Sequence, residues 1–159
     1  MRLNNLVPGV EGEAGEQAVT GFAIDHRKIA PGNIFGAFRG AKFNGEDFIE
    51  AAVAAGAIAV VALPETPVEG AVHIFDEEPR RLFARMAARY FTPTPAHVAA
   101  VTGTNGKTSI AELTRQLWRM DGFNSASIGT LGVTTADEQV KTGLTTPDIV
   151  TFLSNMSGL

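Results

Sequence analysis

Short apolar runs, separated by polar segments rich in glycine and proline, alternate along the first 90 residues. Four of these runs are predicted strands: 19–24, 34–38, 57–63 and 71–75. Ala57 to Leu63 is apolar throughout, which is typical of a strand buried on both faces of a parallel sheet. Two segments with apolar residues at helical spacing are predicted helices: 46–55 and 79–91. The pattern therefore predicts a compact α/β unit with its own core.

Glycine and proline mark the breaks between these elements. Residues 9–17 are acidic and glycine-rich, and we expect a loop there. Ala30-Pro31-Gly32-Asn33 has the residues preferred in a type II turn. Two prolines in Thr92-Pro93-Thr94-Pro95 prevent both helix and sheet pairing, which indicates a stiff linker. We therefore expect a first domain over 1–91, a linker over 92–95 and a second domain over 96–159.

The second domain begins with the pattern of a phosphate-binding loop. A short strand is predicted from His97 to Val101, and Ile110, Leu113 and Leu117 indicate a helix after the loop. Glycines allow backbone N–H groups to face phosphate oxygens, and the helix N-terminus adds its dipole. The strict pattern has glycine where Val101 stands, so the alternative is a glycine-rich turn with an exposed lysine.

Within this loop the side chains suit a nucleoside triphosphate. Lys107 can neutralise phosphate charge, and the Thr108 hydroxyl can hold Mg²⁺. We assign Lys107 as the candidate catalytic residue and Thr108 as the candidate metal ligand. The candidate ATP-binding residues are Gly103, Thr104, Asn105, Gly106, Lys107, Thr108 and Ser109.

The last 35 residues predict a strand at 125–128, a hairpin pairing 133–135 with 139–142, and a helix with Thr146 as its cap. A P-loop domain needs several parallel strands and a later acidic residue for its metal. Only about two strands are predicted after the linker, so we expect a truncated domain, the front portion of a longer enzyme.

Composition narrows the function. A net charge of −4 and a pI near 5.3 give no basic surface for nucleic acid. The chain has no cysteine, which excludes disulfides and thiolate metal sites. Its three histidines are dispersed and show no metal-ligand spacing. No apolar run is long enough for a membrane span, and the first residues lack a signal-peptide pattern, so a cytoplasmic protein is expected.

Three ordered motifs resemble the Mur ligases, and among these the MurE type. Val101 to Thr108 is similar to their ATP loop, which also lacks the first glycine. The segments around Asp25-His26-Arg27 and 45–49 resemble the domain that holds the UDP part of the substrate. Ile128-Gly129-Thr130-Leu131-Gly132 followed by Thr145-Thr146-Pro147-Asp148 favours MurE over MurF.

The resemblance implies an ATP- and Mg²⁺-dependent ligase of peptidoglycan synthesis. Such an enzyme phosphorylates the γ-carboxylate of UDP-N-acetylmuramoyl-L-alanyl-D-glutamate, and a diamino acid then attacks the acyl phosphate. The partners implied are therefore the UDP-linked muramyl dipeptide and a diamino acid. The substrate-binding residues implied are Asp25, His26, Arg27, Lys42, Asn44, Thr145 and Thr146.

Alternatives remain for the roles of single residues and for the function of the whole chain. His26 stands where the family usually has a serine that contacts uridine; imidazole could stack on uracil or donate one hydrogen bond, or be an ordinary surface residue. The Thr145-Thr146 pair is either a helix cap or a substrate contact. The chain as a whole is either the front of a MurE-type ligase, a non-catalytic UDP-sugar binding module, or part of a MurF-like or folylpolyglutamate synthetase-like ligase. We expect negligible ligase activity from these 159 residues alone.

Overall fold

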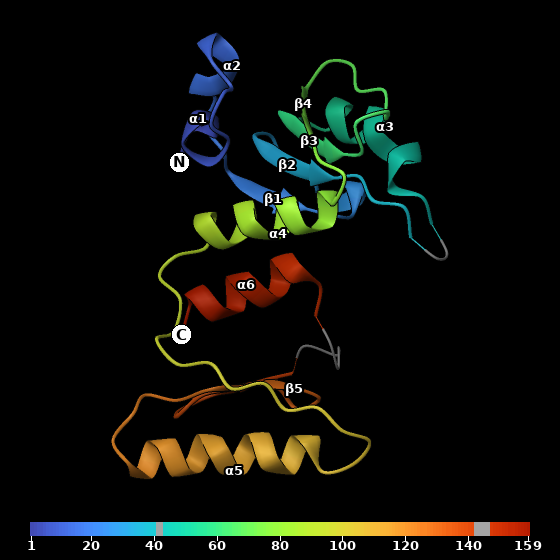
Figure 1. Cartoon of the computed structure of the whole chain (residues 1–159). Helices are drawn as coiled ribbons and strands as arrows, with labels where there is room; N and C mark the ends of the chain where they lie inside the picture. The colour runs from blue at the N-terminus through green and yellow to red at the C-terminus, as the bar shows by residue number, and fades with distance from the viewer. Residues whose placement is uncertain (41–42, 142–146) are drawn as a thin grey trace. The chain divides into compact units, whose positions relative to one another are not determined.

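The computed structural model describes residues 1–40, 43–141 and 147–159. The chain divides into two compact units, Met1–Thr92 and Pro93–Leu159 (Figure 1). Both units combine helices with strands, so the predicted α/β class is confirmed. None of the helices described is long and apolar enough to cross a membrane.

The first unit is built on a four-stranded parallel sheet in the order β1-β2-β3-β4. Its strands are β1 Gly21–Ala23, β2 Asn33–Gly36, β3 Ala59–Ala62 and β4 Val72–Phe75. Every residue of β2 and β3 is buried, as expected for inner strands of a sheet covered on both faces. The four predicted strands are confirmed, each over a shorter range.

Helices cover both faces of this sheet (Figure 1). The unit contains α1 Leu3–Leu6, α2 Gly12–Glu16, α3 Ile49–Ala54, α4 Pro79–Tyr90, and the 3₁₀ turns η1 His26–Lys28 and η2 Gly45–Phe48. On one face, Ile49 and Ala52 of α3 join a core cluster with Phe35 of β2. On the other, the fully buried Phe83 of α4 meets the ring of Phe22 of β1 edge-on, with 5.3 Å between centroids.

Local contacts explain one correct and one wrong prediction. The Asn33 amide donates to the Ala30 carbonyl and Gly32 has a φ of +89°, as a type II turn requires. The loop predicted over 9–17 is wrong, because Gly12–Glu16 forms the short helix α2. Its last residue, Glu16, accepts hydrogen bonds from Arg2 and Asn4, so contacts with the N-terminal segment stabilise a turn that local composition disfavours.

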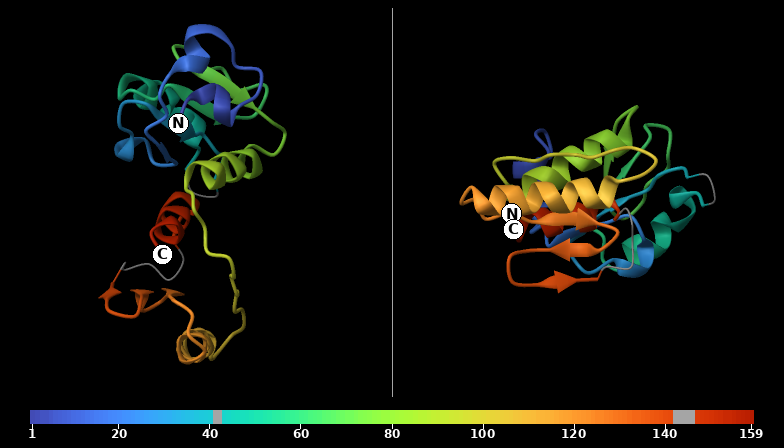
Figure 2. Two further views of the ribbon diagram at one scale, coloured as in Figure 1. Left: turned by 90° about the vertical axis from the view of Figure 1, so that its left-hand side faces the viewer. Right: turned by 90° about the horizontal axis from the view of Figure 1, so that it is seen from below.

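The second unit contains α5 Lys107–Met120, the strands β5 Ser127–Gly129, β6 Gly132–Thr134 and β7 Gln139–Val140, and α6 Ile149–Ser157. The three strands form an antiparallel sheet in the order β5-β6-β7, and β5 contacts α5 (Figure 2). The predicted hairpin is confirmed, since Thr134 pairs with Gln139. The strand predicted at 125–128 forms as β5, and its partner is antiparallel.

The strand predicted from His97 to Val101 is wrong: these residues belong to no strand, and Val98 is 62% exposed. A strand exists only where a neighbour completes its hydrogen bonds. Among the described residues no segment pairs with this one. An apolar sequence of β-forming residues is therefore left extended without a sheet.

Candidate nucleotide-binding sites

The first candidate site lies where β1 ends, at the carboxyl edge of the parallel sheet. Asp25 caps η1 by accepting the Arg27 amide at 3.1 Å, and it also receives the Arg27 guanidinium through Nε at 2.9 Å and Nη2 at 2.7 Å. Hydrogen bonding from Arg27 lowers the pKa of Asp25 to about 2. The carboxylate therefore stays ionised at neutral pH, and it holds the Arg27 guanidinium in place.

A ring stack joins this turn to the segment after β2. The imidazole of His26 lies parallel to the ring of Phe48, at 7° and with 4.3 Å between centroids. Phe48 ends η2, 22 residues further along the chain. The sequence predicted Phe48 as an apolar helix position within the segment 45–49 that resembles the UDP-binding domain, but not as a site residue.

Asn44 caps η2. Its side-chain oxygen accepts the Glu46 amide at 3.2 Å, and its amide group donates to Asp47 at 3.2 Å. Asn44 therefore shapes the turn that carries Phe48, and its polar atoms are already engaged in doing so. Lys42, the other candidate in this loop, lies outside the described residues.

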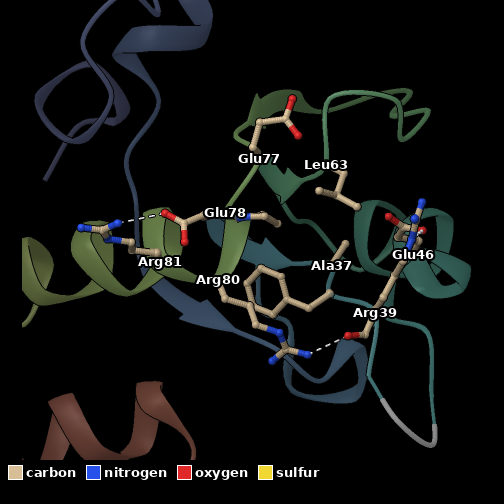
Figure 3. Close-up of a pocket in the computed structure, with 10 residues that line it drawn as sticks. Ala37, Arg39, Glu46, Leu63, Glu77, Glu78, Arg80 and Arg81 are labelled. Carbon is tan, nitrogen blue, oxygen red and sulfur yellow. Dashed lines mark hydrogen bonds and ion pairs between the residues drawn. The ribbon is translucent and has the colours of Figure 1, made fainter.

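A cleft of about 350 Å³ lies beside this loop, beyond the ends of β2, β3 and β4 and at the start of α4 (Figure 3). Its cations are all engaged. Arg39 pairs with Glu46 at 2.8 Å, and Arg80 lies over the Phe38 ring and donates to the Arg39 carbonyl at 2.9 Å. Arg81 pairs with Glu78 at 2.9 Å.

Glu46 connects this cleft to the Asn44 turn. Desolvation opposes its ionisation, but hydrogen bonds from Arg39, Thr66 and Asn44 outweigh it and lower the pKa of Glu46. The groups that line the cleft thus neutralise one another, so it is a weaker anion site than its arginines suggest.

The second candidate site is the glycine-rich loop that precedes α5. Gly106 caps the helix with a φ of +77°, a conformation that favours glycine, and α5 begins at Lys107. The Lys107 ammonium turns back over the loop and donates to the carbonyls of Gly103 and Thr104. The structure thus brings the predicted glycines and lysine together at the exposed N-terminus of a 14-residue helix, where an anion would meet free N–H groups and a positive dipole.

Thr108 and Ser109 lie in the first turn of α5, and both are exposed. The Thr108 hydroxyl offers one oxygen to a Mg²⁺ ion. The described residues contain no group of three histidine, cysteine or acidic side chains that could hold a metal. These residues therefore fit an ion held by Thr108 together with phosphate oxygens and water, a common mode for Mg²⁺.

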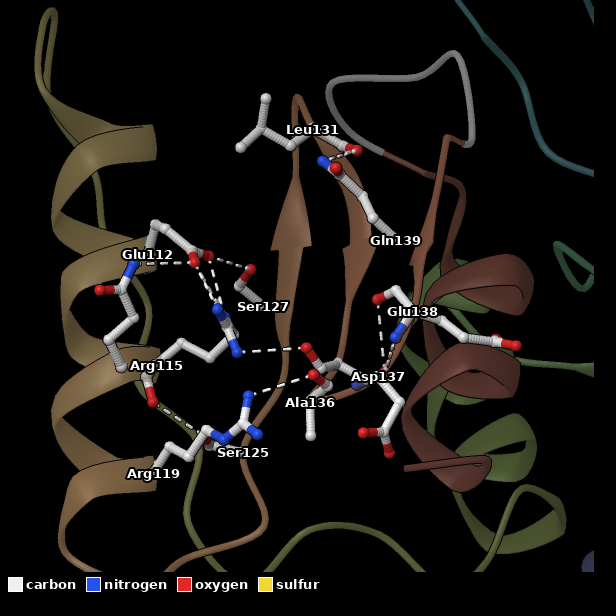
Figure 4. Close-up of polar contacts among 12 residues, drawn as sticks. Glu112, Arg115, Arg119, Ser125, Ser127, Leu131, Ala136, Asp137, Glu138 and Gln139 are labelled. Carbon is white, nitrogen blue, oxygen red and sulfur yellow. Dashed lines mark hydrogen bonds and ion pairs between the residues drawn. The ribbon is translucent and has the colours of Figure 1, made fainter.

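The two faces of α5 have opposite character. Ile110, Leu113 and Leu117, whose spacing predicts this helix, are 52%, 58% and 62% exposed. The face that contacts the sheet is polar: Arg115 is 8% exposed, and it bonds to Glu112 and donates to the Thr135 carbonyl at 3.1 Å (Figure 4). The predicted helix is confirmed, but among the described residues its apolar positions do not face the sheet, which packs on the other side.

Charge and hydrogen bonding on the polar face hold α5 to the strands. The Arg115 guanidinium lowers the pKa of Glu112 to about 2, and Ser127 of β5 also donates to this carboxylate at 3.3 Å. The buried Ser125 hydroxyl donates to the Arg115 carbonyl at 2.7 Å. Arg119 donates to the Ala136 carbonyl at 3.1 Å.

Thr145 and Thr146 lie outside the described residues. The predicted role of Thr146 as helix cap is nevertheless wrong, because Asp148 is the N-cap of α6. The Asp148 carboxylate accepts the amides of Val150 at 2.9 Å and Thr151 at 3.0 Å. A carboxylate at this position satisfies two free amides and complements the helix dipole, which a threonine two residues earlier cannot do.

The parallel sheet of the first unit and the lysine-bearing loop of the second define an α/β protein with the local architecture of a phosphate-binding loop. The sequence profile of the Mur ligase family, catalytic domain, matches residues 18–104, and that of the Mur ligase middle domain matches residues 101–159. The chain belongs to the Mur ligase family.

Two bacterial relatives are both named UDP-N-acetylmuramoyl-L-alanyl-D-glutamate--2,6-diaminopimelate ligase. The Zymomonas mobilis protein is 60% identical over 95% of this chain and 31% of its own length. The Bradyrhizobium diazoefficiens protein is 43% identical over 98% of this chain and 33% of its own length. The chain thus spans about a third of the length of these relatives.

Solved structures agree. A structure of a ligase of that same name matches 99% of this chain and 33% of its own, with a TM-score of 0.78 and 27% identity. A Thermotoga maritima MurF ligase in complex with ADP matches 67% of this chain, with a TM-score of 0.55 and 26% identity. The stronger match is to the diaminopimelate ligase, in line with the motifs that favour MurE over MurF.

Proposed function

We propose that this chain is the front segment of a MurE-type ligase, which adds a diamino acid to UDP-N-acetylmuramoyl-L-alanyl-D-glutamate in peptidoglycan synthesis. The observation that carries the proposal is the 60% identity, over 95% of the chain, to a relative with that substrate in its name. Because the relatives are named for 2,6-diaminopimelate, we take it as the amino acid added. The cytoplasm is the proposed compartment.

The two units divide the substrates between them. We assign 1–91 to the UDP-linked substrate, 92–95 to a linker and 96–159 to the first part of the ATP-binding domain. In the first domain Asp25, His26, Arg27 and Asn44 are the proposed contacts, together with Lys42. In the second, Thr145 and Thr146 are the proposed contacts to the sugar-peptide part.

The reaction proposed is phosphoryl transfer followed by acyl transfer. The γ-phosphoryl group of ATP moves to the substrate carboxylate with release of ADP, and the amine of the diamino acid then displaces phosphate to form the amide. Gly103 to Gly106 would cradle the phosphates through backbone N–H groups, and Thr108 would hold Mg²⁺. Lys107, now bonded to loop carbonyls, would move to the transferring phosphoryl group, where positioning and charge neutralisation supply most of the rate.

Ligand titration of the 159-residue chain tests both assignments. We expect UDP and the UDP-linked dipeptide to bind, and ATP with Mg²⁺ to protect residues 103–109 from hydrogen exchange. Lys107→Met should abolish the ATP protection and leave UDP binding unchanged. Lys28→Met, a change of an exposed lysine in the first unit, is the matched control.

Other results would favour the alternatives. UDP binding without any ATP protection that depends on Lys107 would support a non-catalytic UDP-sugar module. A chain that binds neither ligand would contradict both assignments. Phosphate release on addition of ATP, the dipeptide substrate and diaminopimelate should stay at background, and robust turnover would refute the proposal that this is only the front of the enzyme.

A further inference from the structure

The His26–Phe48 ring pair joins the two segments of the first candidate site through side chains. Both rings are half-buried, and they lie parallel with 4.3 Å between centroids. His26 follows β1 and Phe48 follows β2, so the pair sits at the carboxyl edge of a parallel sheet. In open parallel sheets this edge is where ligands bind.

The pair is built in layers. Phe48 packs against the core cluster that contains Ile49, so the core supports one side of its ring. The same ring stacks on the imidazole of His26. One face of the His26 imidazole is therefore covered by Phe48. Because His26 is only half-buried, we take the opposite face as the position that a further ring would occupy.

Both rings are also held from their backbones. The Asp25 carboxylate accepts the Arg27 amide and closes the turn under His26. The Asn44 side chain accepts the Glu46 amide and closes the turn that ends in Phe48. Because both turns that carry the rings are already capped, the rings lose little conformational entropy when a ligand binds, which favours binding.

We infer that Phe48 is a positioning residue that holds His26 flat, so that the imidazole stacks on the uracil ring of the UDP-linked substrate. The inference rests on the proposed function, because uracil is the only planar aromatic group of a uridine diphosphate. It adds to that function the group that recognises the base and the residue that orients it. Stacking accounts for a histidine at this position, where a hydroxyl would offer only a hydrogen bond.

The test compares UDP with 5,6-dihydro-UDP, whose saturated base is no longer flat but keeps both carbonyls and the ring N–H. Calorimetric titration of the 159-residue chain should show about ten-fold weaker binding of the dihydro ligand, the scale of one base-on-aromatic stack. His26→Ser should bind UDP about ten-fold more weakly and should discriminate less than two-fold between the ligands. Phe48→Leu should lose part of the discrimination, and Phe48→Tyr should retain it.

Phe75→Leu controls for the removal of an aromatic ring, because Phe75 is 62% exposed and belongs to another strand end. Thermal melts of all variants separate a loss of packing from a loss of recognition, since a purely structural ring would lower the melting temperature without changing the ratio between the ligands. Equal discrimination in the wild-type chain and His26→Ser would overturn the inference while leaving UDP binding by the first unit intact. Failure of the wild-type chain to bind UDP would overturn the proposed function and this inference with it.

Discussion

Replacement of Arg115 by methionine should loosen α5 from its sheet. The side chain keeps its bulk but loses the charge that faces Glu112 and the donor to the Thr135 carbonyl. Breaking a buried pair by removing one partner costs about 3–5 kcal/mol. Glu112 is 24% exposed and keeps its hydrogen bonds from Gln116 and Ser127, so we expect the lower figure of about 2–3 kcal/mol.

The only tryptophan of the chain makes this measurable in the second unit alone. Trp118 lies on α5 and is half-buried, so its fluorescence during urea unfolding reports on this helix. With a slope of about 1 kcal/mol per molar urea, the midpoint should fall by about 2–3 M. Arg119→Met removes a single exposed hydrogen bond and should shift the midpoint by less than about 1 M.

The pH dependence gives an independent reading of the same pair. The folded-state pKa of Glu112 is about 2, below the ordinary value of 4.5. A depressed pKa contributes stability that is complete above about pH 4.5 and is lost as the pH falls toward 2. Arg115→Met should flatten this part of the stability curve. Equal midpoint shifts in Arg115→Met and Arg119→Met, or an unchanged acid slope, would refute the view that Arg115 and Glu112, through Thr135 and Ser127, hold α5 to its sheet.

Two further changes test the packing of each unit. Phe83→Ala should lower the unfolding free energy of the first unit by about 3–5 kcal/mol, because the ring is fully buried between Phe22 and Phe38. Phe75→Ala should cost less than about 1 kcal/mol, and equal shifts of the two variants in calorimetric melts would contradict this view of the core. Asp148→Ala should cost about 1 kcal/mol, because it frees the amides of Val150 and Thr151, and hydrogen exchange in the first turn of α6 should become faster. Asp148→Asn should retain most of the cap, and unchanged exchange in the alanine variant would contradict the capping role of Asp148.

The sheet of the first unit was predictable because its signals are local. Ala57 to Leu63 is apolar throughout, and β3 is buried on both faces as that pattern requires. The Pro31-Gly32 turn depends only on the backbone preferences of its own residues. The second unit was less predictable, because whether His97 to Val101 becomes a strand depends on a neighbour that its own sequence does not specify.

The candidate sites show the same difference between local signals, which could be predicted, and long-range contacts, which could not. The glycine-rich turn could be predicted from the sequence, since Gly103, Gly106 and Lys107 lie within five residues and the left-handed cap at Gly106 is a local requirement; its binding of ATP stays a prediction. Phe48 was missed because its partner, His26, is 22 residues away, and no periodicity brings the two together.

Contacts between distant residues also limit what could be predicted for α5, because its hydrophobic pattern does not show which face packs against the sheet. Its apolar positions are spaced along one face of a helix, yet the sheet lies against Glu112 and Arg115 on another face. A hydrophobic stripe shows which face of a helix gains most from burial. Charged side chains, however, can be buried where ion-pair and hydrogen-bond partners lie close to them. Arg115 can be buried here because Glu112 and the Thr135 carbonyl meet its charge and donors. The side of the helix that holds the sheet is thus decided by contacts 20 residues apart, from Arg115 to Thr135, and the hydrophobic pattern of α5 alone could not have predicted it.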